Sequence, residues 1–261
     1  MTLTGKVALI TGSTQGIGLA IAEILSAQGA TIPLHGLCAA EEGQRIAAAC
    51  AGRWKVPVDF FAGDLSDPEA ATALVDAVIS RYGRLDIVVN NAGIQHTSPV
   101  VDFPLEWWDA IQAVNLRAPF LITRRAVGVM RRQGWGRIVN IASVHGLVGS
   151  INKAAYCAAK HGLIGLTKVT ALETATDGIT VNAICPGWTQ TPLLEPQIAA
   201  RAAQKGLNRE AAIQDLVGEK QPNKSLIPPA WIGETVAFLC SDPAAAITGA
   251  SITVDGGWTA H

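Results

Sequence analysis

Short apolar runs alternate along the chain with longer segments in which apolar residues recur every three or four positions. The runs have the length of buried strands, and the longer segments have the period of helices that pack on a core. The expected strands are 7–11, 31–35, 58–62, 87–90, 136–142, 180–184 and 251–254. The expected helices are 17–27, 41–51, 68–81, 105–132, 153–176 and 229–240.

This alternation is typical of right-handed βαβ units. It predicts an α/β fold with a doubly wound, mostly parallel seven-stranded sheet of the Rossmann type and helices on both faces. The length suits a single domain over residues 1–261. Residues 190–228 break the rhythm, with helical fragments at 197–204 and 209–219 and no strand. An insertion this long is usually functional, and we interpret it as a helical lid over a substrate pocket.

The charge balance and the cysteine spacing argue against nucleic acid, anionic membranes and metal ions as binding partners. The formal net charge is −1, which gives no long-range attraction to nucleic acid or to an anionic membrane. The N-terminus has no basic region followed by a long apolar run. The five cysteines are scattered, without metal-type spacing, so we expect reduced thiols in a cytoplasmic protein and no metal site.

A glycine-rich turn joins the first expected strand to the first expected helix. It reads Thr-Gly-Ser-Thr-Gln-Gly-Ile-Gly over residues 11–18. Glycines here let the backbone approach a pyrophosphate, and the helix start offers free N–H groups and the positive end of a dipole. Such a turn can also be only a tight connection, but its place between strand and helix favours a dinucleotide site.

Tyr156 and Lys160 lie four apart in an expected helix, so their side chains share one face. An ammonium beside a phenol lowers the pKa of the phenol, and we expect Tyr156 to act as a general base. Ser143, at the end of an expected strand, could hold a carbonyl or alkoxide oxygen. Tyr and Lys at this spacing also occur by chance, and the glycine-rich turn is what gives the pair weight.

Together these motifs resemble the short-chain dehydrogenase/reductase family. The likeness runs from Lys6 to Gly257 and rests on the turn at 11–18, Asp64-Leu65, Asn90-Asn91-Ala92-Gly93, Asn115, Ser143, Tyr156-x-x-x-Lys160 and Pro186-Gly187. The resemblance implies that the catalytic residues are Asn115, Ser143, Tyr156 and Lys160. It implies that Asn115 holds a water molecule in a proton relay.

The same resemblance implies a nicotinamide dinucleotide beyond the carboxyl ends of the strands. The residues expected to bind it are Gly12, Thr14, Gln15, Gly16, Ile17, Gly18, Asp64, Leu65, Asn91, Ala92, Gly93, Tyr156, Lys160, Pro186, Gly187 and Thr191. Gly36 stands at the ribose position, where many NAD-binding folds have an acid. No Lys or Arg stands there to pair with a 2′-phosphate. We predict NAD over NADP, because an unpaired phosphate dianion is costlier than an unpaired hydroxyl.

Several polar residues near the predicted base suit a small carboxylate. His145 follows Ser143 by two, and Lys153 precedes Tyr156 by three. Each alone could equally be a structural or surface residue. A closer resemblance, to bacterial D-3-hydroxybutyrate dehydrogenases, rests on the segments 91–96, 134–143, 145–148, 153–156, 185–188 and 255–258. The substrate residues that it implies are Gln95, Ser143, His145, Lys153, Tyr156, Trp188, Gln197 and Trp258.

That resemblance implies reversible oxidation of D-3-hydroxybutyrate to acetoacetate with NAD, in a homotetramer. Two alternatives stay open. A reductase of another keto acid or of 3-oxoacyl thioesters with NADPH would need a basic 2′-phosphate site and an open groove. A catalytically silent NAD-binding regulator would be free to lose Ser143, Tyr156 or Lys160, and the chain keeps all three.

Overall fold

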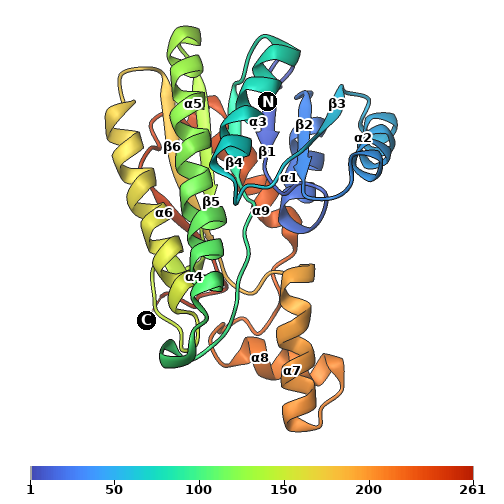
Figure 1. The fold of residues 1–261 in the computed structure, drawn as a ribbon, viewed down its shortest axis with the longest axis vertical. Helices are drawn as coiled ribbons and strands as arrows, with labels where there is room; N and C mark the ends of the chain where they lie inside the picture. Colours follow the sequence, from blue (N-terminus) through green and yellow to red (C-terminus); the bar gives the residue numbers. More distant parts are fainter. Residues whose placement is uncertain (1, 261) are drawn as a thin grey trace.

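Seven parallel strands form the centre of the computed structural model, which describes residues 2–260. Their order is β3-β2-β1-β4-β5-β6-β7, so the direction of winding reverses between β1 and β4 (Figure 1). This confirms the predicted doubly wound sheet. The strands are β1 Ala8–Ile10, β2 Ile32–Gly36, β3 Val58–Ala62, β4 Ile87–Asn90, β5 Gly136–Ile141, β6 Ile179–Pro186 and β7 Ser251–Val254.

Helices cover both faces of the sheet (Figure 1). Side chains alternate across each strand, so Ile10 packs under α1, α2 and α9 while Leu9 packs under α3 and α5. None of the helices within residues 2–260 is long and apolar enough to cross a membrane. The helices are α1 Gly16–Ala27, α2 Ala40–Trp54, α3 Pro68–Tyr82, α4 Leu105–Gln112, α5 Ala118–Gln133, α6 Ala154–Glu173, α7 Glu195–Lys205, α8 Arg209–Gly218 and α9 Pro229–Leu239.

The expected single helix over 105–132 is interrupted. A π-helical turn, Ala113–Arg117, separates α4 from α5. Its wider turn directs the fully buried Asn115 at the backbone of Ile94, where the amide accepts the N–H at 2.9 Å and donates to the carbonyl at 2.9 Å. Single π-turns inside helices often occur at functional sites.

The insertion after β6 forms a separate helical hairpin. It starts with the 3₁₀ turn Pro192–Leu194 and continues as α7 and α8, which project from the main body (Figure 1, orange). Its two ends meet at a β-bridge between Thr189 and Ile227. The helical fragments predicted for this segment are therefore present, and its role as a lid stays a prediction.

Candidate active site

Two glycines of the glycine-rich turn have no room for a side chain. Gly12 has a φ of 63°, and a Cβ atom there would lie 3.0 Å from the Cα of Ala92. A Cβ on Gly18 would lie 2.6 Å from the Asn91 amide nitrogen. Only glycine fits at these two positions, because a side chain would collide with the loop after β4 or would require a strained backbone.

The start of α1 is open to an anion. Gln15 precedes the helix in an extended conformation, makes no side-chain capping bond, and no acidic residue stands in the first turn. The first N–H groups of a helix lack intrahelical partners and carry the positive end of its dipole. Thr14, Gln15, Gly16 and Ile17 all line the large cavity beyond the strands. These residues fit the pyrophosphate of a dinucleotide.

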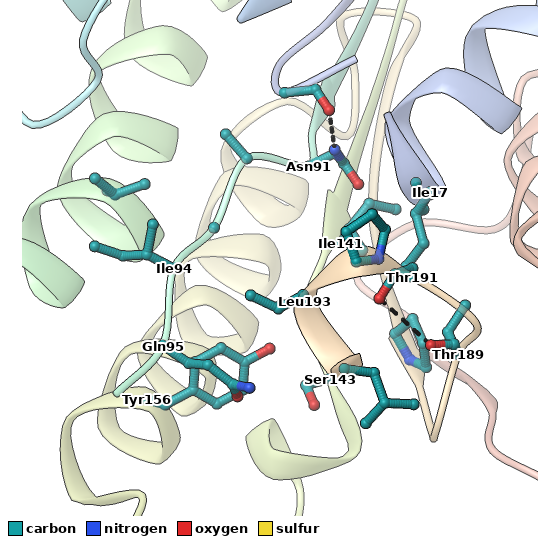
Figure 2. Close-up of a pocket in the computed structure, with 18 of the residues that line it drawn as sticks. Ile17, Asn91, Ile94, Gln95, Ile141, Ser143, Tyr156, Thr189, Thr191 and Leu193 are labelled. Carbon is teal, nitrogen blue, oxygen red and sulfur yellow. Dashed lines mark hydrogen bonds between the residues drawn. The ribbon is translucent and has the colours of Figure 1, made fainter. Parts of the chain in front are cut away.

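The loops after β1 and β4 are bonded to each other. Thr11 Oγ1 accepts the N–H groups of Asn91 and Ala92, both at 3.0 Å. The Asn91 amide in turn donates to the carbonyls of Thr11 at 2.8 Å and Gly12 at 3.1 Å. Figure 2 shows Asn91 beside the cavity. These four bonds hold the two loops together at the point where the strand order reverses, where ligands of such folds bind.

A buried histidine connects the glycine-rich turn to the loop after β3. His35 Nδ1 accepts the N–H of Gly12 at 3.2 Å, so its proton lies on Nε2, 3.1 Å from the carbonyl oxygen of Gly63. Burial lowers the pKa of His35 to about 4, which keeps the ring neutral. Sequence reasoning did not identify this residue, although a polar side chain at the carboxyl end of a strand was a usable signal.

The predicted ribose position lies on the cavity wall. A Cβ atom on Gly36 would lie 2.8 Å from Thr14 Cγ2, so a larger residue does not fit without displacing Thr14. Leu37 follows and is exposed. Among the described residues that line the cavity, the only cations are Lys153 and Lys160, and both belong to its opposite end.

Ser143 and Tyr156 meet at that opposite end of the cavity (Figure 2). The Ser143 side chain follows β5, and its hydroxyl accepts the N–H of His145 at 3.2 Å and lies 3.3 Å from His145 Nδ1. Lys160 Nζ lies 5.6 Å from the centre of the tyrosine ring and donates to the carbonyl of Ile141 at 2.8 Å. Spacing by four on α6 therefore places both side chains beside the end of β5.

One expectation for this pair does not hold in the structure. Lys160 was expected to lower the pKa of Tyr156, but burial raises the pKa of Tyr156 to about 12, and only the nearby Ser143 hydroxyl opposes the rise. Burial also lowers the pKa of Lys160 to about 8. The physical reason is that both groups are withdrawn from water and the ammonium bonds a backbone carbonyl instead of the phenol.

Asn115 lies behind the cavity wall. A Cβ on Gly93 would lie 3.4 Å from Asn115 Oδ1 and 3.7 Å from Lys160 Nζ, so both side chains approach this glycine. Asn115 thus holds the extended loop at Ile94, and Gly93 is the residue that both Asn115 and Lys160 approach. Its role in a proton relay stays a prediction.

The substrate end of the cavity combines cationic and aromatic side chains. Lys153 Nζ donates to Gln197 Oε1 on α7 at 3.1 Å and lies 5.2 Å from the Trp188 ring centre. The Trp188 and Trp258 rings are 5.4 Å apart, and the His145 ring lies 5.3 Å from Trp258. The ordinary strand alternation expected for Ser143 and His145 is replaced by a 3₁₀ turn, Val144–Gly146, which still places both in the cavity.

Lys153 is a buried cation without an anionic partner. Its side chain belongs to a residue only 6% exposed, and no carboxylate within residues 2–260 forms an ion pair with it. Burial lowers its pKa to about 8, so it remains largely protonated at pH 7. Burial and the charge of Lys153 lower the pKa of His145 to about 3. A buried ammonium costs free energy unless an anion pairs with it.

Most of the predicted site residues converge on this one cavity. Every predicted cofactor residue lines it except Gly18, which packs behind the turn, and every predicted catalytic residue lines it except Asn115. The predicted substrate residues that line it are Gln95, Ser143, His145, Lys153, Tyr156, Trp188, Gln197 and Trp258. Their individual roles stay predictions. Lining residues not predicted from the sequence include His35, Ile94, Thr189 and Leu193.

A doubly wound sheet, a glycine-rich turn and a Ser–Tyr–Lys group on one cavity define the class, and the chain belongs to the short-chain dehydrogenase/reductase family. The family model described as enoyl-(acyl carrier protein) reductase matches residues 12–259.

Named relatives are similar over their full length. The chain is 49% identical to D-beta-hydroxybutyrate dehydrogenase of Cupriavidus necator over 99% of this chain and 100% of the relative. It is 46% identical to D-beta-hydroxybutyrate dehydrogenase of Rhizobium meliloti, covering 98% and 99%. The crystal structure of levodione reductase superimposes with a TM-score of 0.90 at 36% identity, covering 98% of both chains.

Proposed function

We propose that this protein interconverts D-3-hydroxybutyrate and acetoacetate with NAD. The observation that carries the proposal is the buried, anion-free ammonium of Lys153, bonded to Gln197 in the cavity that also holds Tyr156. A substrate carboxylate would pair with this charge and satisfy it. The full-length similarity to two D-beta-hydroxybutyrate dehydrogenases supports the same substrate.

The chain's own residues divide the chemistry between binding and proton transfer. Lys153, His145, Gln95 and Gln197 would hold the carboxylate. Tyr156 would take the hydroxyl proton during oxidation and return it during reduction, while Ser143 orients the same oxygen. When bound, the dinucleotide accepts or donates the hydride.

The wall around Gly36 supports NAD as the cofactor. Neither an acid nor a cation stands at the ribose position, and Thr14 leaves no space for a larger residue at Gly36. A 2′-phosphate would therefore meet no compensating charge there, which favours the 2′-hydroxyl of NAD. We also propose a homotetramer, supported by exposed apolar side chains on α4, α5, α6 and α9: Trp108, Phe120, Leu172, Trp231 and Phe238.

The test is a Lys153→Met variant, which keeps an unbranched side chain one atom shorter and removes the charge. A hydrogen bond to a charged, buried group contributes about 2–3 kcal/mol, so KM for 3-hydroxybutyrate should rise about 30- to 150-fold. The dissociation constant for NAD should stay within about twofold. Initial rates of NADH formation and NAD titration by fluorescence measure the two.

Lys168→Met is the matched control, because Lys168 lies exposed on the same helix α6. It should leave KM unchanged. An uncharged secondary alcohol, butan-2-ol, completes the design. Equal turnover of butan-2-ol and 3-hydroxybutyrate by the unmodified protein would rule out a carboxylate site.

A further inference from the structure

Gln221 is a fully buried polar residue that the proposed chemistry does not use. It follows α8, has no exposed surface, and does not line the cavity. Its Oε1 atom accepts the N–H of Trp188 at 2.9 Å. Its Nε2 atom donates to Asn223 Oδ1 at 3.0 Å and to the carbonyl of Ser225. A buried amide with its acceptor and both donors engaged holds its partners in one geometry.

The first of these bonds fixes the backbone of a cavity tryptophan. The N–H of Trp188 is held by Gln221, and its carbonyl accepts the N–H of Ile227 at 2.8 Å. A Cβ atom on Gly187 would lie 2.6 Å from Gln221 Oε1, so the glycine is what allows the amide to come this close. Trp188 is thus held from both sides, with its ring above Lys153.

The bond from Gln221 to Asn223 connects the amide to the turn before Trp258, the second cavity tryptophan. The N–H of Asn223 donates to the carbonyl of Gly256 at 3.2 Å, and the Asn223 amide covers the Cα of that glycine so closely that a Cβ would lie 2.5 Å away. Gly256 lies two residues before Trp258. Asp255 closes this turn by accepting the N–H of Gly257 at 3.0 Å.

We propose that Gln221 is a positioning residue that sets the spacing between Trp188 and Trp258, and thereby the length of hydroxy acid that the pocket accepts. The chain-length part rests on the proposed function. The two rings lie 5.4 Å apart, and each contacts a residue of the carboxylate site, Trp188 with Lys153 and Trp258 with His145. Loss of the three hydrogen bonds of Gln221 would allow the backbones of Trp188 and Trp258 to move relative to each other.

The decisive variant is Gln221→Met, which keeps the volume and removes all three bonds. KM for 3-hydroxybutyrate should rise about tenfold, and the preference over 3-hydroxypentanoate, which is one methylene longer, should fall about tenfold. The Kd for NAD should stay within about twofold. The circular-dichroism couplet of the two neighbouring indoles should weaken without any substrate present.

Asn223→Ala is the second variant, because Asn223 is exposed and its replacement leaves the buried amide and its bond to Trp188 in place. Asn223→Ala should change KM, the chain-length preference and the couplet in the same direction as Gln221→Met, but by less. Gln133→Met is the matched control. Gln133 also makes two side-chain bonds to a backbone, at Leu85, far along the chain and outside the cavity. It should lower the melting temperature and leave KM, selectivity and the couplet unchanged.

The outcomes separate the two proposals. If the unmodified protein does not oxidise 3-hydroxybutyrate, the proposed function fails, and a couplet lost in Gln221→Met but kept in Gln133→Met still supports the positioning role. If the unmodified protein is active and Gln221→Met keeps its KM, selectivity and couplet, the positioning role is overturned. Should Gln221→Met fail to fold, unchanged KM and couplet in Asn223→Ala overturn it as well.

Discussion

At the scale of single residues, the phenol of Tyr156 carries the proton chemistry. Its neighbours are Ser143, whose hydroxyl favours the phenolate, and Lys160, which bonds the carbonyl of Ile141 instead. Burial raises the pKa of Tyr156 to about 12, so the phenol is protonated at neutral pH. A protonated phenol is the form that reduces a ketone, whereas oxidation needs the phenolate.

The two directions should therefore depend differently on pH. The rate of 3-hydroxybutyrate oxidation should rise from pH 6 to 9, because the phenolate fraction grows with pH. Acetoacetate reduction at saturating substrate should stay nearly level over the same range because the phenol stays protonated, whereas KM for acetoacetate should rise above pH 8 as Lys153 loses its proton. Tyr156→Phe should lose about 10²- to 10⁴-fold in both directions, the usual contribution of a general acid–base group. Initial rates followed by NADH absorbance measure all three.

Tyr82→Phe is the control for this prediction. Tyr82 is the other tyrosine of the chain and bonds Asp59, away from the cavity. Its removal should leave both rates unchanged. An oxidation rate that is level from pH 6 to 9, or a Tyr156→Phe protein with most of its activity, would mean that another group transfers the proton.

At the scale of secondary-structure elements, the hairpin of α7 and α8 is stabilised by contacts between its own two helices. Arg201 on α7 bonds Asp215 on α8 at 2.5 Å and Glu219 at 2.6 Å. A small apolar cluster, which includes Leu194, Ile198, Ala212 and Leu216, lies between the two helices. The hairpin thus has internal stability, and Gln197 on α7 reaches Lys153 of the main body.

Arg201→Met should loosen the hairpin without unfolding the protein. Partly exposed ion pairs are worth up to about 1 kcal/mol, which corresponds to about fivefold in a local opening equilibrium. Hydrogen exchange of residues 195–219 should accelerate by about that factor, with little change in melting temperature. Arg81→Met, which removes an ion pair with Asp59 outside the hairpin, should not affect this segment. Unchanged exchange in Arg201→Met would show that the apolar cluster alone holds it.

At the scale of the whole molecule, strands with a local apolar pattern were predicted correctly, whereas contacts between distant residues were not. The bounds of β3, β4 and β7 agree with those predicted, because short apolar runs bounded by turn residues define strands, both in the buried β4 and in the half-buried edge strands β3 and β7. The π-turn at Asn115 was not predicted, since its cause is a bond to Ile94 across 21 positions. The bond between Gln221 and Trp188 spans 33 positions. Contacts of this kind have no local pattern. The raised pKa of Tyr156 likewise comes from burial, which is a property of the folded chain.

Acid stability is also a property of the whole molecule. His35 and His145 are buried with pKa values of about 4 and 3, below the ordinary 6.5 of the unfolded chain. Between these values the unfolded chain binds more protons, so their contribution is complete above pH 6.5 and is lost as pH falls toward 4. From pH 6.5 to 4.5, His35 alone should account for about 2 kcal/mol of lost stability.

Urea unfolding at pH 6.5 and 4.5 measures this loss. In His35→Asn, which cannot titrate, the drop in unfolding free energy between the two pH values should shrink by about 2 kcal/mol. The variant should also bind NAD more weakly, because the two hydrogen bonds by which the His35 ring connects Gly12 to Gly63 are lost. An equal drop in both proteins would mean that His35 is protonated in the folded state.

Because Thr189 and Ile227 form a β-bridge, the segment between them starts and ends at the same place in the fold. Because its entry and exit are adjacent, that stretch could be transplanted from one member of the family to another with little disturbance of the sheet. The residues predicted to hold the dinucleotide would stay in place except Thr191, while α7 and the contact that Gln197 makes with Lys153 would be exchanged. Recombination at this one junction is a short route by which a common hydride-transfer scaffold can acquire new substrates.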